Sequence, residues 1–329
     1  MKTVSDVKNE LKKGALAFIA AVAVILPLFG ITLYQQLKGC AYNSAASLTE
    51  LVWITTPIIR ISLELNIIWV ILLVLGHYSK DTTVFDNSRP HSNKKIILNK
   101  GFAAFIITAA ISLAYFAISA FFCFKYRWLL DTMYWCIRQT SVDSFDLGFM
   151  ALMSLTVFVF CLAFYWYAAL CCCVSRSAAT GFVLAALGVL SVLSLINFLN
   201  YCEFHAASSL MGGFKNMLAG TVFYNYAFCI LVLIFSFLLL IISMPAAILL
   251  YSEGNSKHPF FRHRAADIAT MLFIAAVCAF YMPTLIDDPE ANIPVIAIIS
   301  GICGFSLSFA ANRLITKNNK KTQTEEAKK

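Results

Sequence analysis

The chain has 329 residues, of which 60% are hydrophobic and only 13% are charged, and its formal net charge is +8. So small a charged fraction excludes an ordinary globular domain of this length and indicates a multi-pass membrane protein. The basic residues lie in short gaps beside apolar segments, where they orient a membrane protein and meet anionic lipid. The net charge therefore does not indicate a nucleic-acid-binding protein.

Eight apolar segments follow one another, each long enough to cross about 30 Å of hydrocarbon as a helix. The first follows Lys8, Lys12 and Lys13 as a secretory signal would, but its length and the lack of a cleavage site favour a retained helix. We predict an all-α, polytopic bundle of about eight transmembrane helices. The predicted spans are 14–34, a second that begins between 51 and 61 and ends near 76, 102–124, 147–172, 178–199, 224–251, 268–286 and 293–315.

The charged gaps predict the topology. Nineteen of the 25 Lys and Arg residues lie in the N-terminal segment, in every second gap and in the C-terminal tail. The positive-inside rule then places both termini in the cytoplasm. Residues 1–316 are predicted to form a single transmembrane domain, and the polar tail 317–329 is predicted to be disordered.

The N-terminal segment 1–13 is amphipathic at helical spacing. Val4, Val7, Leu11 and Ala15 share a face, and the lysines lie elsewhere. Two interpretations stay open: an elbow-like helix in the inner headgroup layer, or a charged flank that only sets topology.

Arg60 and Glu64 are four residues apart, on one helical face, within or at the outer end of the second span. Charges at membrane depth are costly and face a protein interior or water, and pairing at this spacing partly offsets the cost. The pair forms a polar patch on a translocation path or subunit interface, unless the span begins near Ile61 and Arg60 lies among outer headgroups.

The longest cytoplasmic gap is the loop 77–100. Its first half is polar and rich in turn formers, Pro90 disfavours helix at Arg89, and Ser92 can cap a helix that continues into the third span. This order predicts a docking device for a cytoplasmic partner, with an ordinary basic loop as the alternative.

The order Ser-Arg-Pro-x-Ser-x-Lys-Lys-Ile-x-Leu-x-Lys resembles the first cytoplasmic loop of type 2 ABC exporter permeases. The matching positions are Thr83, Pro90, Ser92, Lys94, Lys95, Lys100 and Gly101. Segment 1–13 is similar to the elbow helix of that family, the turn 175–177 to its second cytoplasmic contact, and 208–221 to its outer re-entrant segment. The resemblance covers about residues 1–251. The two further spans, within 252–316, are similar to eight-span permeases of Gram-positive antibiotic and peptide export systems.

The resemblance implies a non-catalytic permease subunit of an ATP-driven export complex in the plasma membrane. A second permease subunit, identical or different, would complete the translocation path. Separate ATPase subunits would bind ATP and Mg²⁺, so this chain would hold no cofactor. The residues expected to contact the ATPase subunit are Asp86, Arg89, Pro90, Ser92, Lys94, Lys95 and Arg176.

The sequence gives little indication of nucleotide binding, metal binding or catalysis. No P-loop is present, and Asp287, Asp288 and Glu290 form one acidic outer loop, which favours a solvated turn over a metal site or a prenyltransferase motif. No Ser/His/Asp or Cys/His arrangement is evident. The alternative functions are an ATP-independent transporter, a sensory membrane protein and an integral-membrane enzyme acting on lipid.

Small residues in the spans predict packing. Gly301 and Gly304 form a strip typical of close helix contacts. The triplet 171–173 is interpreted as buried apolar cysteines, with palmitoylation as the alternative. Cys40, Cys136 and Cys202 lie on the outer side, and the sequence does not show whether any two of them form a disulfide.

Overall fold

The computed structural model describes residues 2–42, 66–78, 93–125, 147–205, 224–251, 261, 264–285 and 293–326. Regular structure in these ranges is helical, apart from one isolated bridge between Ser175 and Phe261. The predicted all-α class is confirmed. The chain divides into two compact units, Met1–Tyr167 with Lys215–Ile248 and Ala168–Phe214 with Leu249–Lys329.

The first unit begins with α1 (Lys2–Lys13), α2 (Ala15–Ala20), a π-helical turn η1 (Ala21–Ile25) and α3 (Leu26–Tyr42). Helix Asn66–Tyr78 and α6 (Asn93–Lys125) follow. Most of α8 (Leu147–Val174) and of α11 (Tyr224–Leu250) completes the unit.

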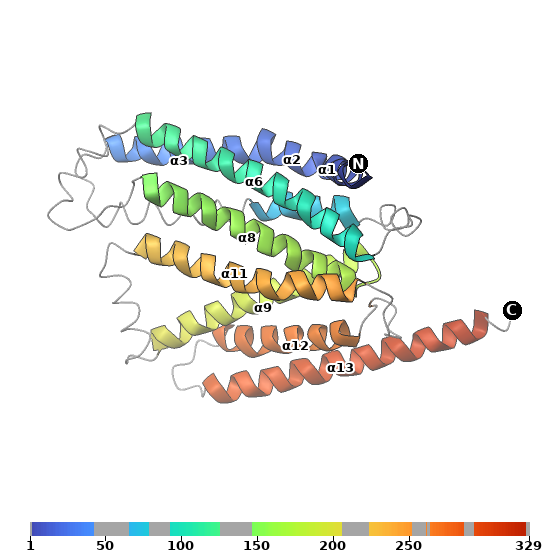
Figure 1. The fold of residues 1–329 in the computed structure, drawn as a ribbon. Coiled ribbons are helices and arrows are strands. Elements are labelled where there is room, and N and C mark those ends of the chain that lie inside the picture. The colour runs from blue at the N-terminus through green and yellow to red at the C-terminus, as the bar shows by residue number, and fades with distance from the viewer. Residues whose placement is uncertain are drawn as a thin grey trace. The chain divides into compact units, whose positions relative to one another are not determined.

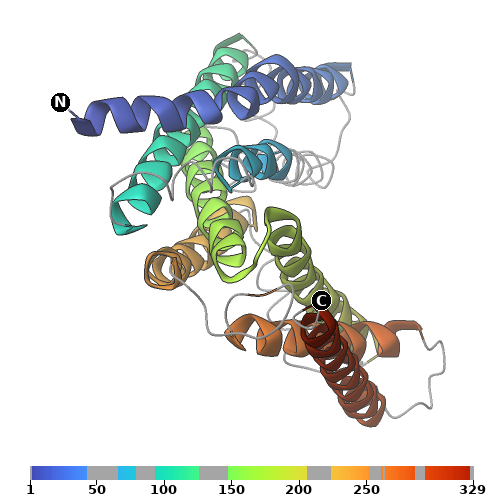
Figure 2. The same ribbon diagram turned by 90° about the vertical axis from the view of Figure 1, so that its right-hand side faces the viewer.

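An elbow separates α1 from the helices that follow it. In Figure 1 α1 is seen nearly end-on while α2 and α3 run across the view, and in Figure 2 α1 is seen from the side. The bend falls at Gly14, where a Cβ would lie 2.6 Å from Ile107 Cδ1 and 2.7 Å from Leu73 Cδ1. A larger residue at this position would therefore require the ends of the Ile107 and Leu73 side chains to move.

The second unit contains the end of α8, α9 (Ala178–His205), α12 (Arg264–Tyr281), a 3₁₀ turn η2 (Met282–Leu285) and α13 (Ile293–Glu326). Helix α12 packs against both α9 and α13, and Figure 1 shows α12 and α13 side by side. A Cβ on Gly304 would lie 2.8 Å from Cys278 Cβ, and one on Gly301 would lie 3.1 Å from Ala279 Cβ. The predicted close contact of small residues is confirmed.

The single transmembrane domain predicted for residues 1–316 stays a prediction beside this division into two units. The residues 252–316, predicted as two spans added to the domain, belong to the second unit with α9. Helix α12 packs against both α9 and α13, and its contact with α13 is made by small residues, which creates a second centre of packing.

Within the described ranges, five helices are long and apolar enough to cross a membrane, as judged by length and composition. They are Ala15–Gln35, Lys94–Phe122, Met150–Val174, Cys229–Leu250 and Val295–Ile315. Three shorter apolar helices, Asn66–Tyr78, Ala178–Val192 and Ala266–Tyr281, fall in the remaining predicted spans. The order of all eight agrees with the prediction of about eight spans, and the orientation of the termini stays a prediction.

Two helices extend beyond their predicted ends. Helix α13 continues to Glu326, so the part of the tail up to that residue is helical rather than disordered. Extending an existing helix costs little, and Lys, Gln and Glu are good helix formers. Helix Asn66–Tyr78 includes His77, which the sequence placed at the start of a loop. Helix α6 begins at Asn93, as expected for the predicted helix that Ser92 caps and that continues into the third span.

Candidate functional site

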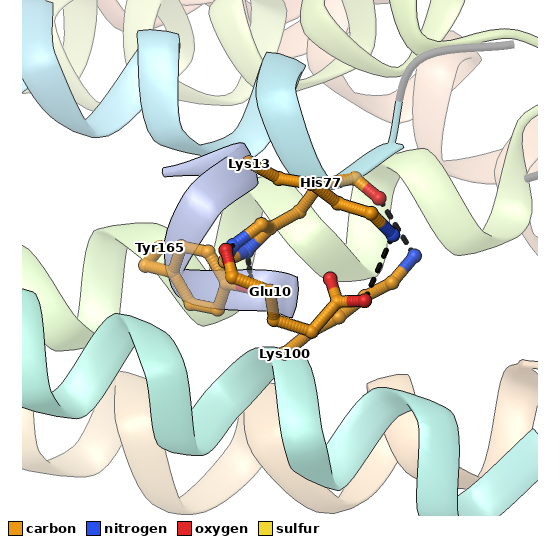
Figure 3. A network of polar contacts seen from close by, with 5 residues as sticks. All are labelled: Glu10, Lys13, His77, Lys100 and Tyr165. Carbon is orange, nitrogen blue, oxygen red and sulfur yellow. Dashed lines mark hydrogen bonds and ion pairs between the residues drawn. The ribbon is translucent and has the colours of Figure 1, made fainter. Parts of the chain in front are cut away.

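A buried cluster of polar side chains joins four helices of the first unit. Its members are Glu10 and Lys13 of α1, His77 of helix Asn66–Tyr78, Lys100 of α6 and Tyr165 of α8, and Figure 3 shows them pointing toward one another. His77, Lys100 and Tyr165 are fully buried, and Glu10 is 3% exposed. Lys and Glu side chains are rarely buried unless they are paired. We call these five residues the polar junction.

Lys100 links the two helices that flank residues 79–92. Its Nζ donates a hydrogen bond of 2.6 Å to the backbone oxygen of His77 and lies 4.5 Å from the centroid of the Tyr78 ring. The last four carbonyls of a helix lack a partner inside the helix, and a positive charge there is favoured by the helix dipole. Lys100 therefore caps helix Asn66–Tyr78 from the side of α6.

His77 connects α1 to α8. Its Nε2 lies 3.2 Å from the backbone oxygen of Glu10, and its Nδ1 lies 2.8 Å from the Tyr165 hydroxyl oxygen. A carbonyl oxygen only accepts, so Nε2 carries the hydrogen and donates to Glu10. In the neutral ring Nδ1 then accepts from the Tyr165 hydroxyl. Both ring nitrogens are thus used to hold helices that are distant in sequence.

The end of α1 lies directly on helix Asn66–Tyr78. Lys13 Nζ and Glu10 Oε1 form an ion pair of 2.8 Å, in which both side chains are mostly buried. A Cβ on Gly76 would lie 2.5 Å from the backbone oxygen of Lys13, so the two backbones touch. The contact fixes both the position and the rotation of α1.

A second polar group lies at the other end of helix Asn66–Tyr78. The Asn66 Nδ2 donates to the Tyr115 hydroxyl at 2.9 Å, and Trp69 Nε1 donates to Asn66 Oδ1 at 2.5 Å. All three side chains are fully buried. Asn66 and His77 are about three turns apart and share a face, so one helix holds polar contacts at both of its ends.

Of the residues predicted from the sequence to contact a partner subunit or to form a charged pair, the structure describes only some. Lys94 is exposed and Lys95 is half-buried at the start of α6, and neither belongs to the polar junction. The remaining predicted positions of the loop and the charged pair lie outside the described residues: Asp86, Arg89, Pro90, Ser92, Arg60 and Glu64.

Arg176 lies in the turn between α8 and α9 and is exposed. Its Nε donates to the backbone oxygen of Phe261 at 3.3 Å, and the neighbouring Ser175 pairs with Phe261 in an antiparallel bridge. On the other side of the turn, the Thr180 backbone N–H donates to Ser177 Oγ at 3.2 Å and so caps the start of α9. The turn is therefore held in place by its own chain.

None of the five residues of the polar junction was among the contact residues predicted from the sequence. Glu10 and His77 are polar residues within about a turn of an apolar segment, and that position was the available signal. Tyr165 lies in an aromatic-rich part of α8 and gave no signal of its own.

The cysteines and acidic residues of the described ranges were also considered as a possible metal site. No group of three or more His, Cys, Asp or Glu residues there can hold a metal ion. Cys171, Cys172 and Cys173 are all buried, as the packing interpretation predicted.

Together the helices define a multi-pass helical membrane protein with a buried polar junction in its first unit. Comparison with family models, with curated proteins and with solved structures finds no match. The inference of function therefore starts from the junction and from the resemblance of the loop sequence.

Proposed function

We propose that this chain is the permease subunit of an ATP-driven export complex in the plasma membrane, with ATP hydrolysed by separate subunits. The observation that carries the proposal is the link between Lys100 and His77, which holds together the two helices flanking residues 79–92. In the resemblance to type 2 ABC exporters, this segment is the part that receives force from the ATPase subunit.

The polar junction is suited to passing such a force into the bundle. Lys100 joins the two flanking helices, so they move together rather than apart. The bonds of His77 extend the movement to α1 through Glu10 and to α8 through Tyr165. Hydrogen bonds in a buried, low-dielectric network resist separation more strongly than exposed ones. Closure of the ATPase subunits would thus tilt four helices as one body.

The proposed contacts with the ATPase subunit begin at the first turn of α6. Lys94 is exposed there and can meet an acidic surface, with Lys95 beside it. The loop residues Asp86, Arg89, Pro90 and Ser92 extend this contact, and Arg176 supplies a second one. A second permease subunit completes the translocation path, and both termini face the cytoplasm.

The test is co-purification of the tagged chain with an ATP-binding subunit encoded beside it. Reversing two charges, with Lys94→Glu and Lys95→Glu together, is expected to lower the amount of co-purified ATPase about tenfold or more, because like charges at a contact repel. Lys125→Glu, at the opposite end of α6, is the matched control and should change nothing. Purification without any ATP-binding subunit, together with no effect of the charge reversal on assembly, would refute the proposal.

A further inference from the structure

The polar junction determines which face of α1 points away from the bundle. Glu10, Gly14 and Ala17 are buried along one side of α1 and α2. Lys8 and Lys12 lie on the opposite side and are both exposed. On the apolar face that the sequence suggested for membrane contact, Val7 and Leu11 are half-buried, so this face lies between the buried side and the side of the lysines. The outward face of α1 is basic.

This outward face changes from basic to apolar at the elbow. Beyond Gly14 it continues with Leu16 and Ile19, which are 67% and 59% exposed. Large apolar side chains so exposed belong in hydrocarbon, whereas lysines belong in the headgroup layer. The boundary between the headgroup layer and the hydrocarbon of the membrane thus falls within about one turn of Gly14.

The neighbouring helix α6, which packs against α1, shows the same change. Lys94 is exposed at its start, and Leu98 and Phe102 are 46% and 55% exposed one and two turns later. Two adjacent helices therefore place the headgroup boundary independently.

We propose that Lys8 and Lys12 form a binding site for an anionic phospholipid, whose acyl chains lie against Leu16 and Ile19. The spacing of four residues places the two ammonium groups side by side on one helical face, where both can meet one anionic headgroup. The order of charge and apolar surface along the helix matches the order within a phospholipid molecule. The site stands apart from the proposed export function.

A regulatory consequence does rest on the proposed function. The polar junction holds α1 to the helices on both sides of residues 79–92. A lipid bound to the outward face of α1 would therefore stabilise the position of those helices, and ATPase coupling would depend on anionic lipid.

The direct test is native mass spectrometry of the purified full chain, titrated with phosphatidylglycerol or phosphatidylcholine of the same acyl chains. The wild-type chain is expected to prefer phosphatidylglycerol. The double variant Lys8→Gln, Lys12→Gln should lose about tenfold or more of its phosphatidylglycerol affinity, since a lysine near an anionic surface contributes about 1 kcal/mol. The double variant Lys8→Arg, Lys12→Arg keeps both charges and should keep the preference.

Equal binding of the two lipids by the wild-type chain, or an unchanged preference in the Gln variant, overturns the site. Should the double variant fail to fold, the single variant Lys8→Gln is expected to lose part of the preference, and full retention there overturns the site equally. ATPase activity in vesicles with and without phosphatidylglycerol tests the regulatory link. A lipid preference without an ATPase response refutes the link and leaves the site, whereas absence of any ATPase partner bears only on the proposed function.

Discussion

The contact between Gly76 and the end of α1 gives a sharp test of the polar junction. In the variant Gly76→Ala the new Cβ would lie 2.5 Å from the backbone oxygen of Lys13. A backbone atom cannot turn aside as a side chain can, so the two helices must separate. Inserting a methyl group into a packed site costs about 1–3 kcal/mol, while alanine gains up to about 1 kcal/mol over glycine in helix propensity.

The variant Gly30→Ala removes the propensity gain from the comparison. Gly30 lies in α3, and its nearest neighbours to an added Cβ are Ile118 Cγ2 at 3.8 Å and Phe122 Cε2 at 4.0 Å, which is ordinary contact. Both variants gain the same helix propensity, so the difference between them isolates the clash. We expect Gly76→Ala to be less stable than Gly30→Ala by about 1–3 kcal/mol.

The assay is thermal unfolding of the two purified variants in the same detergent, followed by loss of the monodisperse peak in size-exclusion chromatography. The expected difference corresponds to several degrees in the unfolding midpoint. Equal midpoints for the two variants would show that α1 does not lie on helix Asn66–Tyr78, and the description of the polar junction would then be wrong.

Three further predictions concern single contacts. Tyr165→Phe leaves Nδ1 of His77 without its donor and should lower stability by about 1–3 kcal/mol in the same thermal assay, and an unchanged midpoint would contradict the assigned hydrogen bond. Gly304→Ala should destabilise by about 1–3 kcal/mol because its Cβ meets Cys278; Cys278→Gly should relieve the clash, so that a double-mutant cycle shows coupling of about 1 kcal/mol or more. Cys303→Ala should change stability in that assay by less than about 0.5 kcal/mol because the exposed side chain loses no packing partner, and a loss as large as that of Gly304→Ala would contradict its exposed position.

The sequence predicted the helices well because hydropathy is a local property. Each apolar helix falls in a predicted span, and α6 begins at Asn93, directly after the residue expected to cap it. The packing of Gly304 was predictable for the same reason, since small residues three or four positions apart lie on one helix face.

The polar junction could not be predicted from local pattern. His77 contacts Glu10 and Tyr165, which are 67 and 88 residues away in sequence. Its burial depends on partners supplied by other helices, and without them a histidine beside Gly76 is typical of a loop. Lys100 was likewise interpreted as a charge that only sets topology. The sequence does not show that its ammonium group donates a hydrogen bond to the end of helix Asn66–Tyr78.

The wide spacing of the polar junction along the chain has a consequence for biosynthesis. The ribosome makes Glu10 near the start, His77 and Lys100 later, and Tyr165 only when half of the chain has been completed. Until α6 emerges, the last carbonyls of helix Asn66–Tyr78 have no ammonium donor, and until α8 emerges His77 lacks its hydroxyl partner. Segments made first generally fold first, but here the N-terminal elbow gains its contacts only after helix Asn66–Tyr78 and α6 have been made. A nascent chain arrested before α6 should therefore leave α1 open to protease, and one arrested after α6 should not.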